Sequence, residues 1–356
     1  MNREETSRTL HERVRSFIET SVTGSPTETF DSLACAIARF QAEHVPTVRA
    51  AFQRADLAPS ELSESSKIPA IPTDVFRLRR VAAHPETSDV RIFATSGTTD
   101  ALRGRHAFRD LETYRRGALR WAERMLWPDV PSLRLVMLAC DEERAPESSL
   151  SYMLARFAER HQNGAWFWDG ERLDTDGIVA ALTEPSNVPV LVLGTSFAFV
   201  HLRDSLPSTL PLPKGSRVMQ TGGFKGRSRE VAASELRRAI AEAFAIDETA
   251  VVAEYGMTEL SSQLYQRLGD DGVHYFAPPW LRVEAACPIT LEPLSRGTEG
   301  IARFVDLANI DSAVAIQTAD RVVVDDRGAV SLLGRMPGAP PRGCSLALEH
   351  ALAAEG

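Results

Sequence analysis

The chain has 356 residues, which is long enough for two or three structural units around a large buried core. Hydrophobic residues make up 44% and charged residues 25%, as in ordinary globular proteins, and no apolar run approaches the roughly 20 residues that a membrane helix needs. A net charge of −8 without a basic patch argues against general nucleic-acid binding.

The chain begins with a charged segment that lacks the apolar core of a secretory signal, so we expect a cytoplasmic protein. Residues 7–20 and 31–56 carry apolar side chains at helical spacing and predict two or three amphipathic helices that form an N-terminal cap. Two prolines within 68–72 then predict an extended path. The apolar residues 90–94 predict a short strand.

The middle of the chain alternates apolar strands with helices. Helices are predicted at 110–126 and 150–161, and buried strands at 133–138, 188–193 and 250–254. This alternation predicts an α/β layer. Residues 282–333 have a more β-like pattern and predict a β-rich part in addition.

The stretch TSGTTDALRG, residues 95–104, is rich in hydroxyl groups and glycine. Four side-chain hydroxyls come from Thr95, Ser96, Thr98 and Thr99. Gly97 and Gly104 let the backbone approach a ligand where a Cβ would clash, and clustered N–H groups form an anion-binding concavity. The stretch therefore predicts a loop for a triphosphate, with a Ser/Thr-rich surface turn as the alternative.

A second motif, EYGMTE, follows a predicted strand at residues 254–259. It offers the ring of Tyr255, a close approach at Gly256, the hydroxyl of Thr258 and the carboxylate of Glu259. Magnesium on nucleotides prefers oxygen ligands, so a carboxylate here suits that ion. The alternative is a strand-to-helix turn in which Thr258 caps the helix.

A third motif, TADR at residues 318–321, precedes a hairpin-like segment and the sequence LLGR. Asp320 is suited to accept hydrogen bonds from two ribose hydroxyls, with Arg335 near the same sugar or the phosphates. The alternative is an exposed aspartate in a turn.

Four widely separated cysteines show neither CxxC spacing nor Cys/His pairing, so they predict no zinc site and no disulfide framework. Cys35, Cys140 and Cys287 occupy helical, strand-end and pre-proline positions where a buried structural thiol is usual. Cys344 follows a hinge rich in proline and glycine, and Arg342 favours its thiolate. Cys344 is therefore the candidate for a mobile nucleophile, with an incidental terminal thiol as the alternative.

In combination the motifs resemble the adenylate-forming acyl ligase superfamily. TSGTTDALRG is similar to that superfamily's TSGTTGxPKG, EYGMTE to YGxTE, TAD to TGD, and LLGR to the GR before its hinge. Residues 60–350 resemble more narrowly the acyl-protein synthetases of bacterial bioluminescence, on the segments KIPAIPTDVFR, GTSFAFVHL, TGGFKGRSRE and PRGCSLALEH.

The resemblance implies an α/β fold of the adenylate-forming N-terminal type, in which mixed sheets are layered with helices and joined by a smaller β-rich subdomain. It implies three parts: an N-terminal helical cap (1–66), an adenylate-forming catalytic body (67–335), and a hinge with a short tail that carries Cys344 (336–356). Only 13 residues remain from Cys344 onward, so we expect the mobile C-terminal domain of ordinary family members to be lacking.

The resemblance further implies a two-step ligase reaction that uses ATP and Mg²⁺. A carboxylic acid, of the fatty-acid class, attacks ATP to give an acyl-adenylate and pyrophosphate, and a cysteine thiolate then takes the acyl group as a thioester. Relatives imply an acyl reductase or an acyl carrier as the partner protein.

Site residues are implied at the matching positions. Thr95, Ser96, Gly97, Thr98 and Thr99 would hold phosphates, Glu259 would face the metal, and Cys344 would accept the acyl group. The remaining ATP-binding positions are Gly222, Gly223, Tyr255, Gly256, Thr258, Asp320 and Arg335. Residues 194–202 are a candidate wall of the acyl pocket through Phe197, Phe199 and His201, with an apolar core strand as the alternative.

The sequence departs from the superfamily at two points. Asp100 replaces a glycine and adds negative charge beside phosphates, while Arg103 occupies the place of the loop lysine and keeps its charge. The catalytic lysine of the C-terminal domain has no counterpart, because no lysine follows Lys225. Lys225 is therefore the candidate cation for the departing pyrophosphate, with Arg103 and Arg227 as second choices.

Two other functions remain open at this point. One is an acyl-CoA or aryl-CoA ligase resembling the phenylacetate enzymes, with coenzyme A as acceptor and no role for Cys344. The other is a non-catalytic nucleotide-binding relative, which the charge of Asp100 keeps open.

Overall fold

A computed structural model describes residues 2–24, 26–95, 103–206, 208–222 and 232–336. The chain divides into two compact units. Unit 1 comprises Met1–Arg120, Met257–Gln263 and the chain from Ala277 onward. Unit 2 comprises Trp121–Gly256 and Leu264–Phe276, so the chain passes from unit 2 into unit 1 inside the EYGMTE motif.

Unit 1 opens with the helices α1 (Arg3–Thr23), α2 (Phe30–His44) and α3 (Pro46–Arg54), which confirms the helices predicted at the N-terminus. The side chain of Asn2 caps α1 by accepting from the Glu5 N–H, and Thr29 caps α2 in the same way. Pro46 begins α3 because proline suits the first turn of a helix, where its missing N–H would have no partner.

The β-rich part of unit 1 is an antiparallel sheet in the order β11 (Leu281–Ala286), β12 (Glu299–Asp306), β13 (Ala315–Val324), β14 (Val330–Arg335). The short β1 (Ile71–Pro72) pairs in parallel with β13. This sheet confirms the β-like pattern of 282–333. A short helix α4 (Val75–Leu78) follows β1, and 3₁₀ turns lie at Pro59–Glu61, Ser65–Lys67 and Glu86–Ser88.

Two more strands of unit 1, β2 (Arg91–Ala94) and β3 (Arg105–Phe108), form a separate antiparallel ribbon. Its residues pair from Arg91 with Phe108 to Ala94 with Arg105, so the two strands close the hydroxyl-rich loop between them. Helix α5 (Glu112–Met125) follows and runs from unit 1 into unit 2.

Unit 2 is the α/β layer that the sequence predicted. Its parallel strands are β4 (Arg134–Leu138), β5 (Gly164–Trp166), β6 (Val190–Thr195), β7 (Arg217–Thr221) and β8 (Val251–Tyr255), in the spatial order β8-β7-β6-β4-β5. The antiparallel β9 (Leu264–Gln266) and β10 (Tyr275–Phe276) extend the sheet from β8. The helices are α6 (Ser149–His161), α7 (Thr175–Thr183), α8 (Ser196–Ser205) and α9 (Ala233–Phe244), with a 3₁₀ turn at Glu248–Ala250.

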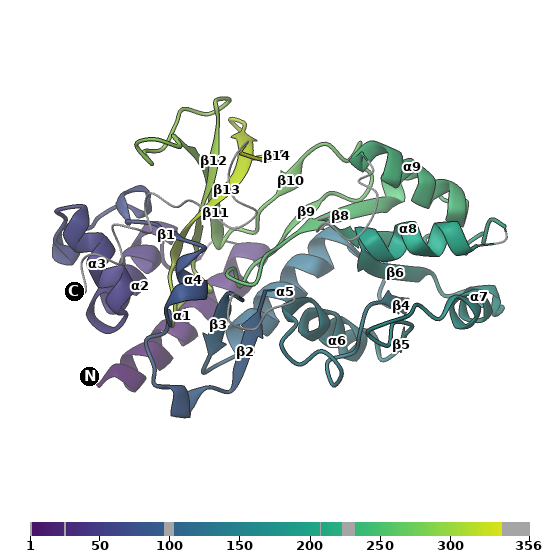
Figure 1. Cartoon of the computed structure of the whole chain (residues 1–356), viewed down its shortest axis with the longest axis horizontal. Coiled ribbons are helices and arrows are strands. Elements are labelled where there is room, and N and C mark those ends of the chain that lie inside the picture. The colour runs from purple at the N-terminus through teal and green to yellow at the C-terminus, as the bar shows by residue number, and fades with distance from the viewer. Residues whose placement is uncertain (1, 25, 96–102, 207, 223–231, 337–356) are drawn as a thin grey trace. The chain divides into compact units, whose positions relative to one another are not determined.

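Right-handed crossovers place α7, α8 and α9 on one face of this sheet and α6 on the other, because the chain reverses its direction across the sheet after β5. Figure 1 shows α8 and α9 together over the β6–β8 part of the sheet. Alternate residues of the strands, such as Val192 and Val218, join apolar residues of these three helices in one core.

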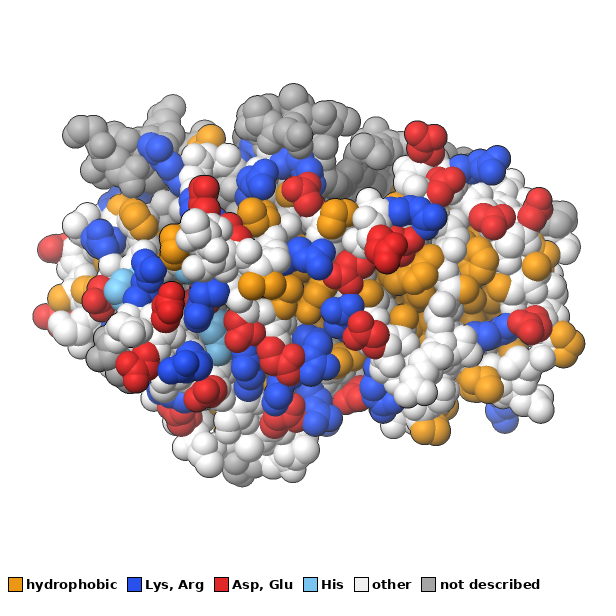
Figure 2. Space-filling model, turned by 90° about the horizontal axis from the view of Figure 1, so that it is seen from below, with side chains coloured by type: hydrophobic (Ala, Val, Ile, Leu, Met, Phe, Trp, Pro, Cys, Tyr) orange, Lys and Arg blue, Asp and Glu red, His pale blue; other side chains and the backbone are white. Residues whose placement is uncertain are grey.

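The face of the molecule in Figure 2 carries Lys and Arg side chains intermixed with Asp and Glu, so no field of one sign covers that face. None of the helices in the described ranges combines the length and the apolar character needed to cross a bilayer.

Candidate functional site

The base of the hydroxyl-rich loop is a closed, hydrogen-bonded ring. The Thr95 N–H donates to the Gly104 carbonyl at 2.9 Å, and the Gly104 N–H donates to Thr95 Oγ1 at 2.9 Å. Arg103 Nε donates to the Thr95 carbonyl at 2.7 Å. The loop residues Ser96, Gly97, Thr98, Thr99 and Asp100 lie outside the described residues.

Glu259 lies directly against this base. A Cβ added to Gly104 would stand 3.0 Å from Glu259 Oε1 and 3.1 Å from Thr95 Cγ2. The fold therefore brings together the ends of the loop and a buried carboxylate that are about 155 positions apart in the sequence. Glycine suits position 104, because a Cβ there would crowd that carboxylate.

Arg77 also borders this position, since its Cγ would lie 3.3 Å from a Cβ at residue 104. Its guanidinium lies 3.7 Å from Asp74, which is 6% exposed. Burial raises the pKa of Asp74, although the charges of Arg77 and Arg335 work against this shift. Sequence reasoning did not assign a role to Arg77, even though it ends the segment KIPAIPTDVFR on which the resemblance partly rested.

Asp320 and Arg335 are cross-strand partners on β13 and β14. Arg335 Nε lies 3.4 Å from Asp320 Oδ1. Asp320 thus sits in a strand next to a cation, and the alternative of an exposed turn aspartate is wrong. The hairpin predicted after it is present, with Gly328 at φ 81° in the turn.

Thr258 lies in a turn and begins no helix within residues 232–336, so the helix-cap alternative is wrong. Its carbonyl accepts a hydrogen bond from His106 Nδ1 at 2.9 Å. The His106 side chain is 2% exposed, and burial lowers its pKa to about 4. A carbonyl can only accept, so Nδ1 carries the proton and Nε2 accepts from Ser312 Oγ at 2.8 Å.

In unit 2, the predicted adenine-side residues follow the carboxyl ends of adjacent parallel strands. Gly222 comes directly after β7, and Tyr255 ends β8 with Gly256 next to it. The Gly222 N–H donates to the Glu254 carbonyl at 3.4 Å, so the two strand ends are joined. Carboxyl ends of parallel strands are where α/β sheets bind ligands. Gly223, Lys225 and Arg227 lie outside the described residues.

Glu254 is a buried carboxyl that the sequence analysis did not single out. Burial raises its pKa to about 7, against a hydrogen bond from Thr221 that works in the other direction. A native pKa above the unfolded value means that the folded protein holds this proton longer than the unfolded chain. The contribution of Glu254 to the free energy of unfolding is therefore complete below about pH 4.5. It is lost as the pH rises through about 7.

We predict that Glu254→Gln, which stays neutral, removes this loss. Between pH 5 and 8 the variant's free energy of unfolding should fall less than that of the wild type, as measured by urea unfolding at several pH values. Burial also raises the pKa of Asp306, to about 6. Its effect on the free energy of unfolding is the same in both proteins and therefore cancels in the comparison. Parallel pH profiles for the two proteins would refute the assignment.

The aromatic residues predicted for the acyl pocket divide between two faces of α8. Phe197 and His201 lie one turn apart with parallel rings 6.4 Å between centroids, and Trp168 packs edge-on against both. Phe199 points the other way: it is 2% exposed and packs in the core beside α9. Residues 196–205 form a helix, so the alternative of an apolar strand holds only as far as Thr195.

Cys344 lies outside the described residues. The other three cysteines are free thiols: Cys35 is buried in α2, and Cys140 and Cys287 are partly exposed. Burial raises the pKa of Cys35 and of Cys140, so their thiolates are disfavoured. Hydrogen bonding from the Thr290 N–H lowers the pKa of Cys287, which makes Cys287 the thiol to include as a control in acylation experiments.

The chain is similar to one known protein family and to several solved structures over most of its length. The family model for "Acyl-protein synthetase, LuxE" matches residues 39–353. An open conformation of 2-hydroxyisobutyryl-CoA ligase, in complex with 2-HIB-AMP and CoA, superposes with a TM-score of 0.63 at 16% identity and covers 86% of this chain and 75% of that chain. ATP-bound MatB from Rhodopseudomonas palustris gives a TM-score of 0.51 at 17% identity, over 78% of this chain and 51% of that chain. A search of curated proteins found no match.

The two structural likenesses establish the fold, which is the α/β fold of adenylate-forming ligases, as the motifs had implied. The family match spans most of the chain, including the loop at 95–104, the EYGMTE motif and the segment that contains Cys344. The chain therefore belongs to the LuxE acyl-protein synthetase family.

Proposed function

We propose that this protein activates a fatty acid as an acyl-adenylate with ATP and then transfers the acyl group to Cys344 of its own chain. The observation that carries the proposal is the contact between Glu259 and the glycine that ends the hydroxyl-rich loop. In a member of an acyl-protein synthetase family, that contact joins a phosphate-binding loop to a carboxylate suited to magnesium.

In the first step, a carboxylate oxygen of the acid attacks the α-phosphorus of ATP. The bond from that phosphorus to the bridging oxygen breaks, and pyrophosphate leaves with the electron pair. The loop residues Ser96, Gly97, Thr98 and Thr99 hold the phosphates through hydroxyl and N–H groups. Thr95 contributes only its hydroxyl proton, because its N–H donates to the Gly104 carbonyl. Glu259 would hold the metal ion through its carboxylate oxygens, because Oε1 lies beside Gly104 at the base of the loop.

Magnesium, when bound, supplies positive charge that offsets the charge of the phosphates. Asp320 accepts from the ribose hydroxyls, Arg335 lies beside the same nucleotide, and Tyr255 stacks on the adenine along Gly222 and Gly223. Lys225 is the proposed cation for the leaving pyrophosphate, with Arg103 and Arg227 as second choices. Arg77 joins this group because its side chain borders Gly104.

In the second step, the thiolate of Cys344 attacks the acyl carbonyl carbon, and AMP leaves with the electron pair of the broken C–O bond. The product is a thioester on the protein, which a reductase or an acyl carrier can take up. Arg342 beside Cys344 favours the thiolate form that this step needs.

The acid is proposed to bind against the cluster of Trp168, Phe197 and His201. Phe197 and His201 lie in the first turns of α8, which starts at the carboxyl end of β6. The neighbouring strands β6 and β4 flank the point where the strand order reverses, and ligands of open α/β sheets bind at such points. Phe199 is not part of this cluster, because it packs in the core beside α9.

A pyrophosphate-exchange experiment tests the first step. We expect the protein with Mg²⁺ to incorporate labelled pyrophosphate into ATP only when a fatty acid is present. Coenzyme A is the second candidate acceptor, because the structure of the similar 2-hydroxyisobutyryl-CoA ligase contains bound CoA. Acyl-CoA formed in the presence of coenzyme A would favour that candidate, and no exchange with acids of any chain length would favour a non-catalytic relative.

Gly104→Ala is predicted to lower acid-dependent exchange by about tenfold or more, because the new Cβ would displace Glu259 and small displacements in active sites cost about this much. Gly24→Ala is the matched control, since Gly24 has an extended backbone and no atom within 4 Å of an added Cβ. Equal exchange rates in the two variants would show that the contact with Glu259 is unimportant.

A further inference from the structure

The segment that carries Glu259 is held by the last residue of β12 and by the loop that follows this strand. Asp306, which is fully buried, accepts from the Ser261 N–H at 2.9 Å and from Ser262 Oγ at 2.7 Å. Asn309 donates to the Glu259 carbonyl at 2.9 Å and accepts from Ser261 Oγ at 2.6 Å. We call residues 306–312 the support loop, because its hydrogen bonds fix the Glu259 carbonyl and the two serines that follow.

His106 makes a second connection between the support loop and the motif. It bridges the Ser312 hydroxyl and the Thr258 carbonyl with its two ring nitrogens, as described above. The support loop therefore contacts Thr258 through His106 and reaches residues 259–262 directly.

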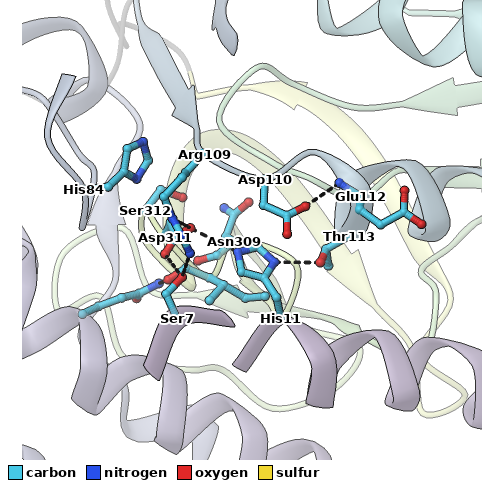
Figure 3. Close-up of polar contacts among 12 residues, drawn as sticks. Ser7, His11, His84, Arg109, Asp110, Glu112, Thr113, Asn309, Asp311 and Ser312 are labelled. Carbon is cyan, nitrogen blue, oxygen red and sulfur yellow. Dashed lines mark hydrogen bonds and ion pairs between the residues drawn. The ribbon is translucent and has the colours of Figure 1, made fainter. Parts of the chain in front are cut away.

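Helix α1 contacts the support loop at Asp311. His11 Nε2 lies 3.1 Å from Asp311 Oδ2, and Ser7 Oγ donates to Asp311 Oδ1 at 2.5 Å. Figure 3 shows both side chains reaching from α1 to Asp311. From α2, Gln41 donates to the carbonyls of Asn309 and Ile310. Two N-terminal helices thus hold a loop that lies about 300 positions later in the sequence.

The contact between α1 and Asp311 is specific in its geometry and charge. Burial alone would raise the pKa of Asp311, but hydrogen bonds from His11 and Ser7 and the charge of Arg109 lower it to about 2, so the carboxylate stays ionised. His11 is oriented in turn by Thr113, whose Oγ1 lies 2.7 Å from Nδ1 (Figure 3). An ionised carboxylate this deeply buried needs these partners, so losing one is costly.

We propose that α1 positions the catalytic segment: His11 and Ser7 fix Asp311, and the support loop fixes Thr258 and Glu259. His11, Ser7 and Asp311 are positioning residues, since they act through the loop. The proposal rests on the proposed function for its effect on catalysis, but its geometry stands without that function. Helix α1 precedes residue 39, where the family match begins, so this contact is a feature of the chain that the match does not cover.

The test uses the full-length chain with His11→Ala. We expect amide hydrogen exchange in residues 257–262 to quicken by about tenfold or more, since the support loop loses one of its anchors. In the exchange of labelled pyrophosphate, the KM for magnesium–ATP should rise by about threefold or more, with a smaller change in kcat, because a less well positioned Glu259 holds magnesium–ATP less tightly in the ground state. Ser7→Ala should act in the same direction, and it serves in place of His11→Ala where the latter does not fold.

Two matched variants separate positioning from stability. His11→Gln keeps an N–H donor for Asp311 and should restore much of the wild-type protection and KM. Arg13→Gln removes an ion pair between α1 and Glu28, at 2.6 Å, without touching the support loop, so it should lower the melting temperature and leave both readouts unchanged.

The outcomes are distinct. Protection of 257–262 that stays at the wild-type level in both His11→Ala and Ser7→Ala would overturn the proposal. Equal loss of protection in Arg13→Gln would overturn it too, because α1 would then act only through global stability. A wild type that exchanges no pyrophosphate defeats the proposed function alone, and hydrogen exchange still decides whether α1 positions the segment.

Discussion

Glu259→Gln is expected to lower fatty-acid-dependent pyrophosphate exchange by about 10²- to 10³-fold, the usual cost of losing one preorganised charge-stabilising group. The side chain is 6% exposed and lies against Gly104, so an amide of the same size fits without a new cavity. The loss should therefore reflect the missing charge. It is measured as the rate of label transfer from pyrophosphate to ATP at saturating acid.

Glu292→Gln is the control for this substitution, because Glu292 is an exposed carboxylate of the same unit that belongs to none of the motifs. It should exchange at the wild-type rate. A Glu259→Gln protein that keeps more than a tenth of the wild-type rate would contradict the assigned role of Glu259.

Asp320→Ala is expected to raise the KM for ATP by about 10²-fold with a smaller effect on kcat. Two hydrogen bonds from ribose hydroxyls to an ionised carboxylate are worth about this much together. Contacts to the ribose are equally strong in the ground state and the transition state. Losing them therefore raises the KM for ATP and changes kcat little. Initial rates of exchange over a range of ATP concentrations measure it.

Asp326→Ala is the matched control, since Asp326 is exposed in the hairpin turn that follows β13. Its KM for ATP should equal that of the wild type. If the two variants behave alike, the strand position of Asp320 beside Arg335 has no special role in ATP binding.

Long elements with clear periodicity could be predicted from the sequence. Helices α1 and α6 and strands β4 and β6 carry enough apolar residues at a regular spacing to be recognised without tertiary information. Strand β7 lacks such a pattern. It holds Arg217, which is 2% exposed because it donates to the Leu126 carbonyl and pairs with Asp129, and those partners lie about 90 positions earlier.

The phase of a helix separates the three aromatic residues that were predicted together for the acyl pocket. Phe197, Phe199 and His201 look equivalent in an apolar segment whose secondary structure is undecided. Once residues 196–205 form a helix, Phe197 and His201 share a face, and Phe199 turns into the core. The segment was assigned to the pocket as a block because its helical register was unknown.

The order of the motifs was sufficient to predict that Glu259 and the loop at 95–104 belong to one site. The order of the motifs was not sufficient to predict which residues support Glu259 and the loop. Asp306, Asn309 and His106 act through hydrogen bonds to backbone groups of 258–262, and polar residues of this kind carry no motif of their own. Their roles become visible only when the two loops are side by side.

The central claim is that the activated acyl group passes to Cys344. It is tested by incubating the protein with ATP, Mg²⁺ and a radiolabelled fatty acid, without coenzyme A, and measuring hydroxylamine-sensitive label on the protein. We predict label on the wild type and on Cys287→Ala, and none on Cys344→Ala, which should keep its acid-dependent pyrophosphate exchange. Label that persists on Cys344→Ala, or a wild type that exchanges pyrophosphate and carries no label, would contradict the account.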